Sequence, residues 1–486
     1  MFTLTQCQFH LCSNNLLKAH SDLLSADNLC ERLGIDYSRN AGIPSFSLNK
    51  EQEGGRSLHM NSPVKSPAAK VAQKQNDTKK LLKIYHSVLY IIFLISTSNY
   101  KEANLRINVL NDIISSLSGD FETVFFSWVP SSFFVILTYL FSCICHRPIA
   151  NIPTAIEFGN KGIKVINTLL THEQNSYIIG TELSKCFIHY KFIILENLIY
   201  IHLSSGKLKL ALEFIEQLVQ LYEQHKENLP GGLSIIHTVL GLYASTLKIP
   251  DYAITHFQFA LHNATYEDLK YIIEIYLSLA YLKTNQLNKA QAFVFSHSKK
   301  LYQHPNRILK AGIYLVEGLL DYHLNNLNQA KVKLKESLSI TNGSLSHNQM
   351  AATALNGLGA VFLKQEPQLQ QSSAILKSSL VLSHRSEDFF SKLASLELLS
   401  NLYSQQEDLL NNSTNESHKI QHEQLWTTEI QAVENLPLSK KLLTKYIKEA
   451  IPSHSSQPTA ETTMNQQPQP SNTHTNKPPP RKRKAK

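Results

Sequence analysis

The segment Ile236–Asn263, IHTVLGLYASTLKIPDYAITHFQFALHN, carries the pattern that decides the fold. A break at Ile249-Pro250-Asp251 separates two apolar-periodic stretches, which predicts two helices joined by a short turn. Four residues stand at fixed spacing across this break: Gly241, Ala253, Phe257 and Ala260. Small residues at three of these positions let two antiparallel helices approach closely, while Phe257 fills the space between them. The segment therefore predicts a tightly packed helical hairpin.

The same pattern returns along the chain. Equivalent small residues follow the first copy in the same register: Ala290, Gly318, Ala330 and Gly359. The alanine markers at positions 211, 253, 290 and 330 are spaced by 42, 37 and 40 residues. This arrangement is typical of the tetratricopeptide repeat, whose standard length is about 34 residues. The prediction is an all-α fold, a tetratricopeptide-like α-solenoid of antiparallel helix pairs wound into a superhelix.

Composition divides the 486 residues into four regions. Residues 1–38 predict partial N-terminal repeat helices, and residues 39–78 are polar with several Gly and Pro, which predicts a flexible insert. Residues 79–450 form the predicted solenoid. Residues 451–486 are rich in Pro, Gln and Ser, so we expect a disordered tail that ends in a basic cluster.

The net charge of +9 belongs mostly to this tail. Its last ten residues hold six basic side chains and leave about +3 for the rest of the chain. The run Arg481, Lys482, Arg483, Lys484 and Lys486 follows three prolines and indicates a nuclear import signal, with a merely solubilising or DNA-attracting tail as alternatives. Ser62 and Ser66 each precede a proline in the insert, which makes them candidate phosphorylation sites.

The first helix of each repeat lines a concave groove, and such grooves commonly bind peptides. By periodicity the candidate groove residues are Thr238, Lys283, Tyr322 and His323. The alternative for each of them is an ordinary half-exposed surface position.

The motifs of common enzymes are missing from the sequence. It contains no Gly-rich phosphate loop, HExxH motif or paired CxxC motif, so we expect neither an enzyme nor a bound metal or cofactor. Cys143-Ile144-Cys145-His146 lacks a second ligand pair and predicts buried structural thiols. The longest apolar stretches, Val88–Ile95 and Phe133–Cys145, are too short to cross a bilayer, and the first residues do not resemble a secretory signal.

Several segments resemble one family. The run His237–Leu269 is similar to a repeat of the Mau chromatid cohesion factors, the tetratricopeptide subunits of the cohesin loading complex. The element Phe125–Pro130, FFSWVP, and the stretches Ala354–Gln365 and Gln8–Arg39 are similar to other parts of this family. The family usually begins with further repeats before the last of these, so we expect either a reduced groove or an incomplete N-terminus, and poor solubility of the isolated chain.

The resemblance implies a non-enzymatic scaffold in the nucleus, associated with chromatin. Members of the family bind the extended N-terminal segment of a Nipped-B-like HEAT-repeat loader, contact cohesin indirectly, and support cohesin loading and sister chromatid cohesion. No membrane or small-molecule substrate is implied. The alternative is another nuclear tetratricopeptide adaptor, of the cell-cycle ubiquitin ligase or chaperone type.

Overall fold

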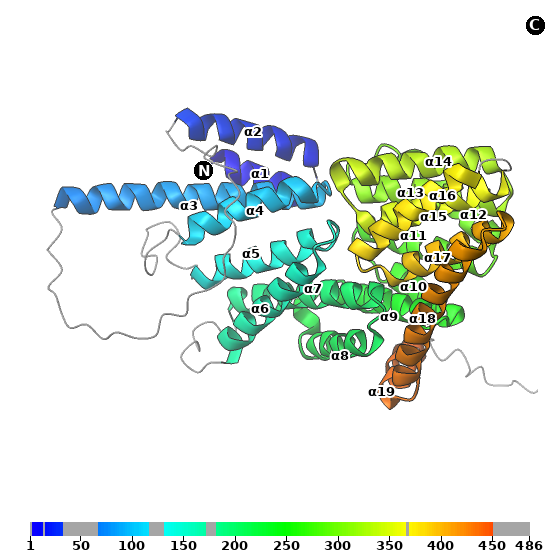
Figure 1. Cartoon of the computed structure of the whole chain (residues 1–486). Helices are drawn as coiled ribbons and strands as arrows, with labels where there is room; N and C mark the ends of the chain where they lie inside the picture. Colours follow the sequence, from blue (N-terminus) through cyan, green and yellow to red (C-terminus); the bar gives the residue numbers. More distant parts are fainter. Residues whose placement is uncertain are drawn as a thin grey trace, which may run out of the picture.

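The computed structural model describes residues 2–12, 15–32, 67–115, 131–171, 181–365 and 369–450. Within these ranges the regular structure is helical and contains no strand (Figure 1). The predicted all-α fold is therefore confirmed. The helices are α1 (Phe2–Cys12), α2 (Leu16–Arg32), α3 (Pro67–Ser96), α4 (Tyr100–Ser115), α5 (Ser131–His146), α6 (Ile152–Thr171), α7 (Glu182–Ser204), α8 (Leu208–Gln224), α9 (Gly232–Thr246), α10 (Pro250–His262), α11 (Glu267–Lys283), α12 (Leu287–Leu301), α13 (Arg307–His323), α14 (Leu327–Ile340), α15 (Asn348–Lys364), α16 (Leu369–Arg385), α17 (Phe389–Gln405), α18 (Leu409–Glu434) and α19 (Pro437–Ala450), with the short turns η2 (Lys226–Asn228) and η3 (Thr341–Leu345).

The helices form successive pairs. Each odd-numbered helix from α1 to α17 packs against the even-numbered helix that follows it, and most pairs also pack against the first helix of the next pair. First helices contact one another along the array, for example α5 with α7 and α13 with α15. This two-layer stacking of hairpins is the arrangement of a helical-pair solenoid, so the predicted solenoid is also confirmed.

One turn geometry recurs inside the pairs. In seven pairs the first helix ends at a residue with positive φ, between 56° and 71°: Ser98, Ala150, Gly206, Lys248, Asn285, Asn325 and Glu407. The backbone N–H of the next residue donates to the carbonyl five positions earlier, at 2.7–3.0 Å. This bond closes the helix end by satisfying a carbonyl that has no partner inside the helix. Repetition of the same turn gives the two helices of these pairs a similar relative orientation.

The superhelix brings distant pairs together at two seams. At the first seam, Ser98 Oγ donates to Asn306 Oδ1 at 2.9 Å, and the N–H of Asn348 donates to the carbonyl of Pro148 at 3.1 Å. These bonds join the ends of α3 and α5 to the starts of α13 and α15. Figure 1 shows the resulting arrangement, with α1–α6 on one side, α9–α17 on the other, and α7 running between them.

At the second seam the C-terminal helices return to the middle of the array. The Lys207 ammonium pairs with Glu387 at 3.2 Å, and the hydroxyls of Tyr243 and Ser439 lie 2.9 Å apart. Trp426 on α18 and Leu443 on α19 are buried in the same hydrophobic core as the residues of α7–α10. The chain therefore closes on itself through α18 and α19 rather than ending as an open array.

The predicted boundary of the polar insert at residue 78 is wrong. Helix α3 begins at Pro67, so residues 67–78 are helical. Proline has a φ angle suited to the first helical position, and the following Ala68 and Ala69 favour helix. The polar composition of this stretch concealed these local signals. Residues 39–66 and 451–486 lie outside the described residues.

Among the described residues, α7 is the one helix long and apolar enough to cross a membrane. Of its most apolar 18-residue window, 61% is buried inside the protein. Its Phe187, Phe192 and Leu195 are each at most 1% exposed. The apolar character of α7 is therefore accounted for by its place in the core.

Candidate functional site

A cluster of charged and aromatic side chains lies on the first helices of three pairs. Arg147 follows α5, Glu196 and Tyr200 belong to α7, and Tyr276 belongs to α11. The Arg147 Cζ atom lies 5.0 Å from the centre of the Tyr200 ring, and the Tyr200 hydroxyl donates to Glu196 Oε1 at 2.7 Å. All four side chains are half-buried. We call these four residues the Arg147 cluster.

Burial governs the ionisation of this cluster. Burial raises the pKa of Glu196, while the hydrogen bond from Tyr200 and the charge of Arg147 lower it. Burial also raises the pKa values of Tyr200 and Tyr276. The neighbouring His347 has a pKa lowered to about 4 by burial and by the Arg147 charge. The tyrosines and His347 are therefore neutral at pH 7, and Arg147 supplies the positive charge.

The Arg147 guanidinium makes no hydrogen bond or ion pair with the described residues. A guanidinium carries five N–H donors, and it binds carbonyl and carboxylate oxygens in a planar geometry. The ring of Tyr200 supports one face of this group without using those donors. The Arg147 cluster can therefore offer a backbone or carboxylate oxygen of a peptide a charge-assisted hydrogen bond.

The four residues predicted to face the groove do not share one environment. The prediction is wrong for Thr238, which is 1% exposed and donates to the Ser234 carbonyl at 2.8 Å. The reason is that α9 packs against α7, α8, α10 and α19, so this part of the helix has no open face.

The other three predicted groove residues lie at the ends of first helices. Lys283 ends α11 and is exposed, yet surrounding protein lowers its pKa by desolvation. Tyr322 and His323 end α13; Tyr322 is half-buried, and His323 is exposed. The Lys364 ammonium lies 3.9 Å from the centre of the Tyr322 ring. The groove position of Lys283, Tyr322 and His323 stays a prediction.

The residues that the repeat pattern placed between helices lie at close helix contacts. A Cβ added to Gly241 would lie 2.6 Å from Phe257, and one added to Gly318 would lie 2.6 Å from Leu334. Gly359 has the same relation to Leu376. The four alanines of the pattern are at most 1% exposed: Ala253, Ala260, Ala290 and Ala330. These residues set the distance between the two helices of each pair.

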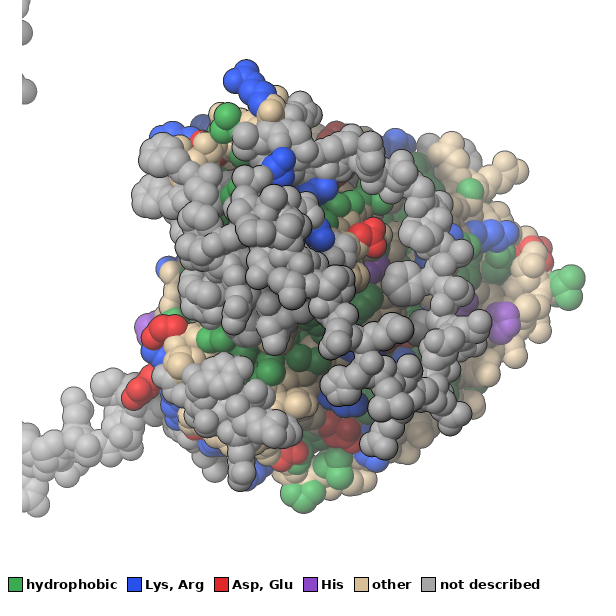
Figure 2. All heavy atoms as spheres, turned by 90° about the vertical axis from the view of Figure 1, so that its left-hand side faces the viewer, with side chains coloured by type: hydrophobic (Ala, Val, Ile, Leu, Met, Phe, Trp, Pro, Cys, Tyr) green, Lys and Arg blue, Asp and Glu red, His purple; other side chains and the backbone are tan. Residues whose placement is uncertain are grey.

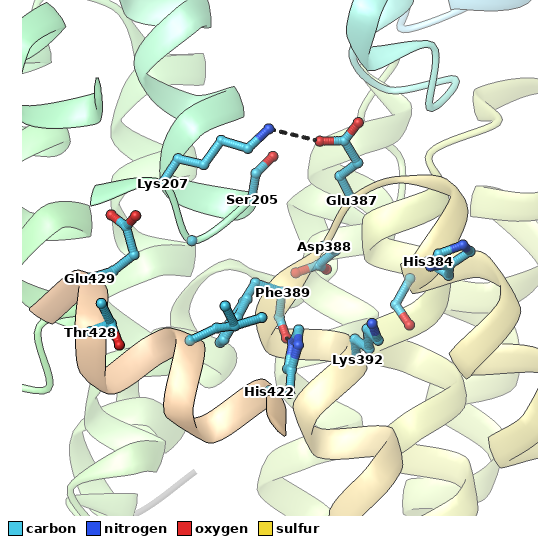
Figure 3. A pocket seen from close by; sticks show the side chains of 13 residues that line it. Ser205, Lys207, His384, Glu387, Asp388, Phe389, Lys392, His422, Thr428 and Glu429 are labelled. Atoms are coloured by element: carbon cyan, nitrogen blue, oxygen red, sulfur yellow. Dashed lines mark hydrogen bonds and ion pairs between the residues drawn. The ribbon is translucent and has the colours of Figure 1, made fainter. Parts of the chain in front are cut away.

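A cavity of about 440 Å³ opens at the second seam (Figure 3). The turn between α7 and α8, the turn between α16 and α17, and α18 line it. Phe389 packs against Gly206 and stacks on His422, with ring centres 3.8 Å apart. His422 Nε2 lies 3.1 Å from the Phe389 carbonyl, which can only accept, so this nitrogen carries the proton. We call this cavity the seam pocket.

The described residues contain no group of three or more His, Cys, Asp or Glu side chains that could hold a metal ion. Cys143 and Cys145 are fully buried, and burial raises the pKa of Cys143 to about 12 and that of Cys145 further. Burial lowers the pKa of the adjacent His146. Both thiols are therefore protonated at pH 7 and belong to the packing of α5.

The N-terminal end of the molecule has a mixed surface. Figure 2 shows hydrophobic side chains there between basic and acidic ones, without one large patch of a single charge among the described side chains. A face that binds nucleic acid usually carries a basic stripe. The described part of this end does not have that character.

Several predicted elements lie outside the described residues. These are the candidate phosphorylation sites Ser62 and Ser66, the FFSWVP element at 125–130, and the basic run Arg481, Lys482, Arg483, Lys484 and Lys486. Their roles stay predictions.

Comparison with known proteins gives the family. The profile described as "Cohesin loading factor" matches residues 67–409, which is more than half of the chain. The chain belongs to the cohesin loading factor family. The resemblance to the Mau chromatid cohesion factors is therefore confirmed. The matched range includes the Arg147 cluster and the retained candidate groove residues.

Curated relatives of this family are similar along much of the chain. The MAU2 chromatid cohesion factor homolog of Nematostella vectensis is 22% identical over 417 residues, which cover 82% of this chain and 66% of the relative. The homolog of Drosophila mojavensis is 24% identical over 300 residues, 59% of this chain and 46% of the relative. The chain thus spans about half to two thirds of the length of these relatives.

Among solved structures, the chain is similar to that of Rap protein complexed with competence and sporulation factor. It has a TM-score of 0.45 and 12% identity, and covers 76% of this chain and 99% of that chain.

Sequence reasoning missed the Arg147 cluster and the seam pocket. Arg147 and Tyr276 are far apart in the chain, and the superhelix alone brings them together. One local signal was available: Glu196 and Tyr200 are polar residues four apart within the apolar helix α7, so they share one face. A polar pair on an otherwise buried helix marks a face that meets something other than the core.

Proposed function

We propose that this protein is a non-enzymatic scaffold of cohesin loading, which binds the extended N-terminal segment of a Nipped-B-like loader. It would thereby support cohesin loading onto chromatin and sister chromatid cohesion. Membership of the cohesin loading factor family carries this proposal. The match includes residues 67–409, where helices α3–α17 and the Arg147 cluster lie.

The chemistry of the first helices supports a peptide ligand. Arg147 offers donors without a partner among the described residues, and Tyr200 and Tyr276 offer aromatic surface beside it. Lys283 adds a second cation at the end of α11. An extended peptide has backbone carbonyls at regular spacing. Hydrogen bonds to these carbonyls and contacts with aromatic rings offset the conformational entropy that the peptide loses on binding.

Co-purification tests this proposal. The full chain is combined with the N-terminal segment of the Nipped-B-like protein from the same organism, and their affinity is measured by titration calorimetry. We expect a stable complex that Arg147→Ala and Lys283→Glu each weaken by roughly tenfold to a hundredfold, since a charge-assisted bond is worth about 1.5–3 kcal/mol. The exposed Lys335 on α14 provides the control variant Lys335→Glu, which should bind as the wild type does. Absence of binding by the wild-type chain would favour another tetratricopeptide adaptor role.

We also propose that the chain acts in the nucleus and that the run Arg481–Lys486 directs its import. A fluorescent fusion lacking these residues should lose nuclear enrichment, while a fusion with Ser62 and Ser66 replaced by alanine should keep it. Nuclear enrichment of both fusions would assign import to another segment or to a partner.

A further inference from the structure

A groove runs over α17 between α16 and α18. Its volume is about 380 Å³, and each helix supplies residues at helical spacing: Leu380 and His384 from α16, Lys392 and Leu396 from α17, and His418, Gln421, His422 and Leu425 from α18. Helix α17 packs against both neighbours, whereas α16 and α18 make at most a marginal contact with each other. Helix α17 therefore forms the floor of the groove, and α16 and α18 form its walls. We call this feature the α16–α18 groove.

The apolar residues of the groove extend from its floor to its rim. Leu396 is 2% exposed and belongs to the floor, Leu380 is half-buried, and Leu425 is 58% exposed. A leucine exposed to this extent beside a cavity leaves apolar area that a ligand side chain can cover. The groove can therefore accept one large apolar side chain.

The formally charged residue that lines the groove is the cation Lys392. None of its eight lining residues is acidic. The Lys392 ammonium makes no hydrogen bond or ion pair with the described residues, and the imidazoles of His384 and His418 make none either. Lys392 is only half-exposed, so its charge is less screened than that of a free surface lysine.

The acidic groups of the adjoining seam pocket already have partners. Glu387 pairs with Lys207, and Glu429 accepts from the N–H of Lys209 at 3.4 Å. Asp388 caps α17 by accepting from the N–H of Ser391 at 3.3 Å. Figure 3 shows His384 and Lys392 at one end of that pocket and Glu429 at the other. The seam pocket therefore does not supply a carboxylate to Lys392.

We propose that the α16–α18 groove binds an extended peptide in which a carboxylate stands next to a large apolar side chain. The carboxylate accepts from Lys392, with His384 and His418 beside it, and the apolar side chain covers Leu396 and Leu425. The groove shares no residue with the Arg147 cluster. In this proposal it is a second docking site, with a ligand separate from the segment bound along the first helices.

Fluorescence anisotropy with the full chain tests this site. The probe is the labelled peptide Gly-Ser-Glu-Leu-Glu-Ser-Gly, and three comparison peptides replace both glutamates by lysine, the leucine by serine, or all three residues. We expect the acidic leucine peptide to bind most tightly. Lys392→Ala and Leu425→Ser should each weaken that binding by roughly tenfold, because each removes one of the two recognised groups.

Val381 on α16 provides a matched control, since it is also 58% exposed and does not line the groove. Val381→Ser should leave the affinity unchanged, and thermal melting should show that all three variants fold. Equal binding of the four peptides, preference for the lysine peptide, or unchanged binding by both groove variants would each overturn the proposal. Preference for the lysine peptide would assign the groove to basic segments instead.

Discussion

Replacing Gly241 by alanine tests whether close helix contact or helix propensity decides the stability of the repeats. Gly241 lies within α9, where alanine in place of glycine favours helix by about 1 kcal/mol. The new Cβ would lie 2.6 Å from Phe257 Cε1 and 2.7 Å from its Cδ1. Ordinary contact begins near 3.4 Å, so one of the two helices or the ring must move by almost 1 Å.

The Phe257 ring has little room for such a movement. It is 1% exposed and stacks on Tyr276, with ring centres 5.9 Å apart. Overpacking of a dense core costs about 1–3 kcal/mol, and over most of this range the cost exceeds the gain in helix propensity. We therefore expect Gly241→Ala to lower the free energy of unfolding by up to about 2 kcal/mol after the gain is subtracted.

Urea unfolding followed by circular dichroism measures this difference. The same substitution in a Phe257→Leu background is the control, because the smaller side chain leaves space for the new methyl group. There the loss should disappear and a gain of up to about 1 kcal/mol should replace it. A stabilised Gly241→Ala single variant would refute the reasoning, since it would mean that the contact yields at no cost.

Three further predictions concern buried polar groups. Burial lowers the pKa of His237 and His256 from 6.5 to about 4, so between these pH values the unfolded chain binds more protons than the folded chain. The free energy of unfolding should therefore fall as the pH falls through this window. Urea unfolding at several pH values should show this dependence of the free energy on pH, and His256→Gln should reduce it. Lys333→Met should cost about 3 kcal/mol, because it removes the cation that lies 2.6 Å from the buried Glu317 carboxylate and leaves the Tyr302 hydroxyl as its remaining donor. Adding Glu317→Gln should restore most of the melting temperature, and no restoration would contradict this account. Tyr243→Phe removes a hydrogen bond to α19 and should cost about 1 kcal/mol; faster amide hydrogen exchange in α19 should accompany the loss, and unchanged exchange would show that this bond does not hold the helix.

The sequence was sufficient for the helix pairs because their contacts are local. Gly241 meets Phe257, and Gly318 meets Leu334, each across sixteen positions of chain. Such contacts depend on helix length and on the turn between two helices. Hydrophobic periodicity indicates the first, and Gly, Pro and Asn residues indicate the second. The start of α3 at Pro67 was missed because the polar composition around it outweighed a local helix-start signal.

The candidate sites could be predicted only in part. Periodicity indicated that Thr238 lies on a first helix, but it could not indicate that α19 packs against that helix. The buried pair His237 and His256 illustrates the same limit, since His256 Nε2 reaches the Leu443 carbonyl at 3.2 Å. A residue's exposure depends on every element that covers it, and some of these lie almost two hundred positions away.

By itself, the sequence determined the helical hairpins, the length of each repeat and the small side chains between paired helices, because these features are set within one repeat. Only the tertiary structure decided that Arg147 lies beside Tyr200, that Lys207 pairs with Glu387, and that α18 and α19 close the array. The physical reason is that the course of a solenoid is the sum of small rotations between successive pairs. Slight changes in each rotation would leave every hairpin intact and bring different residues together at the seams.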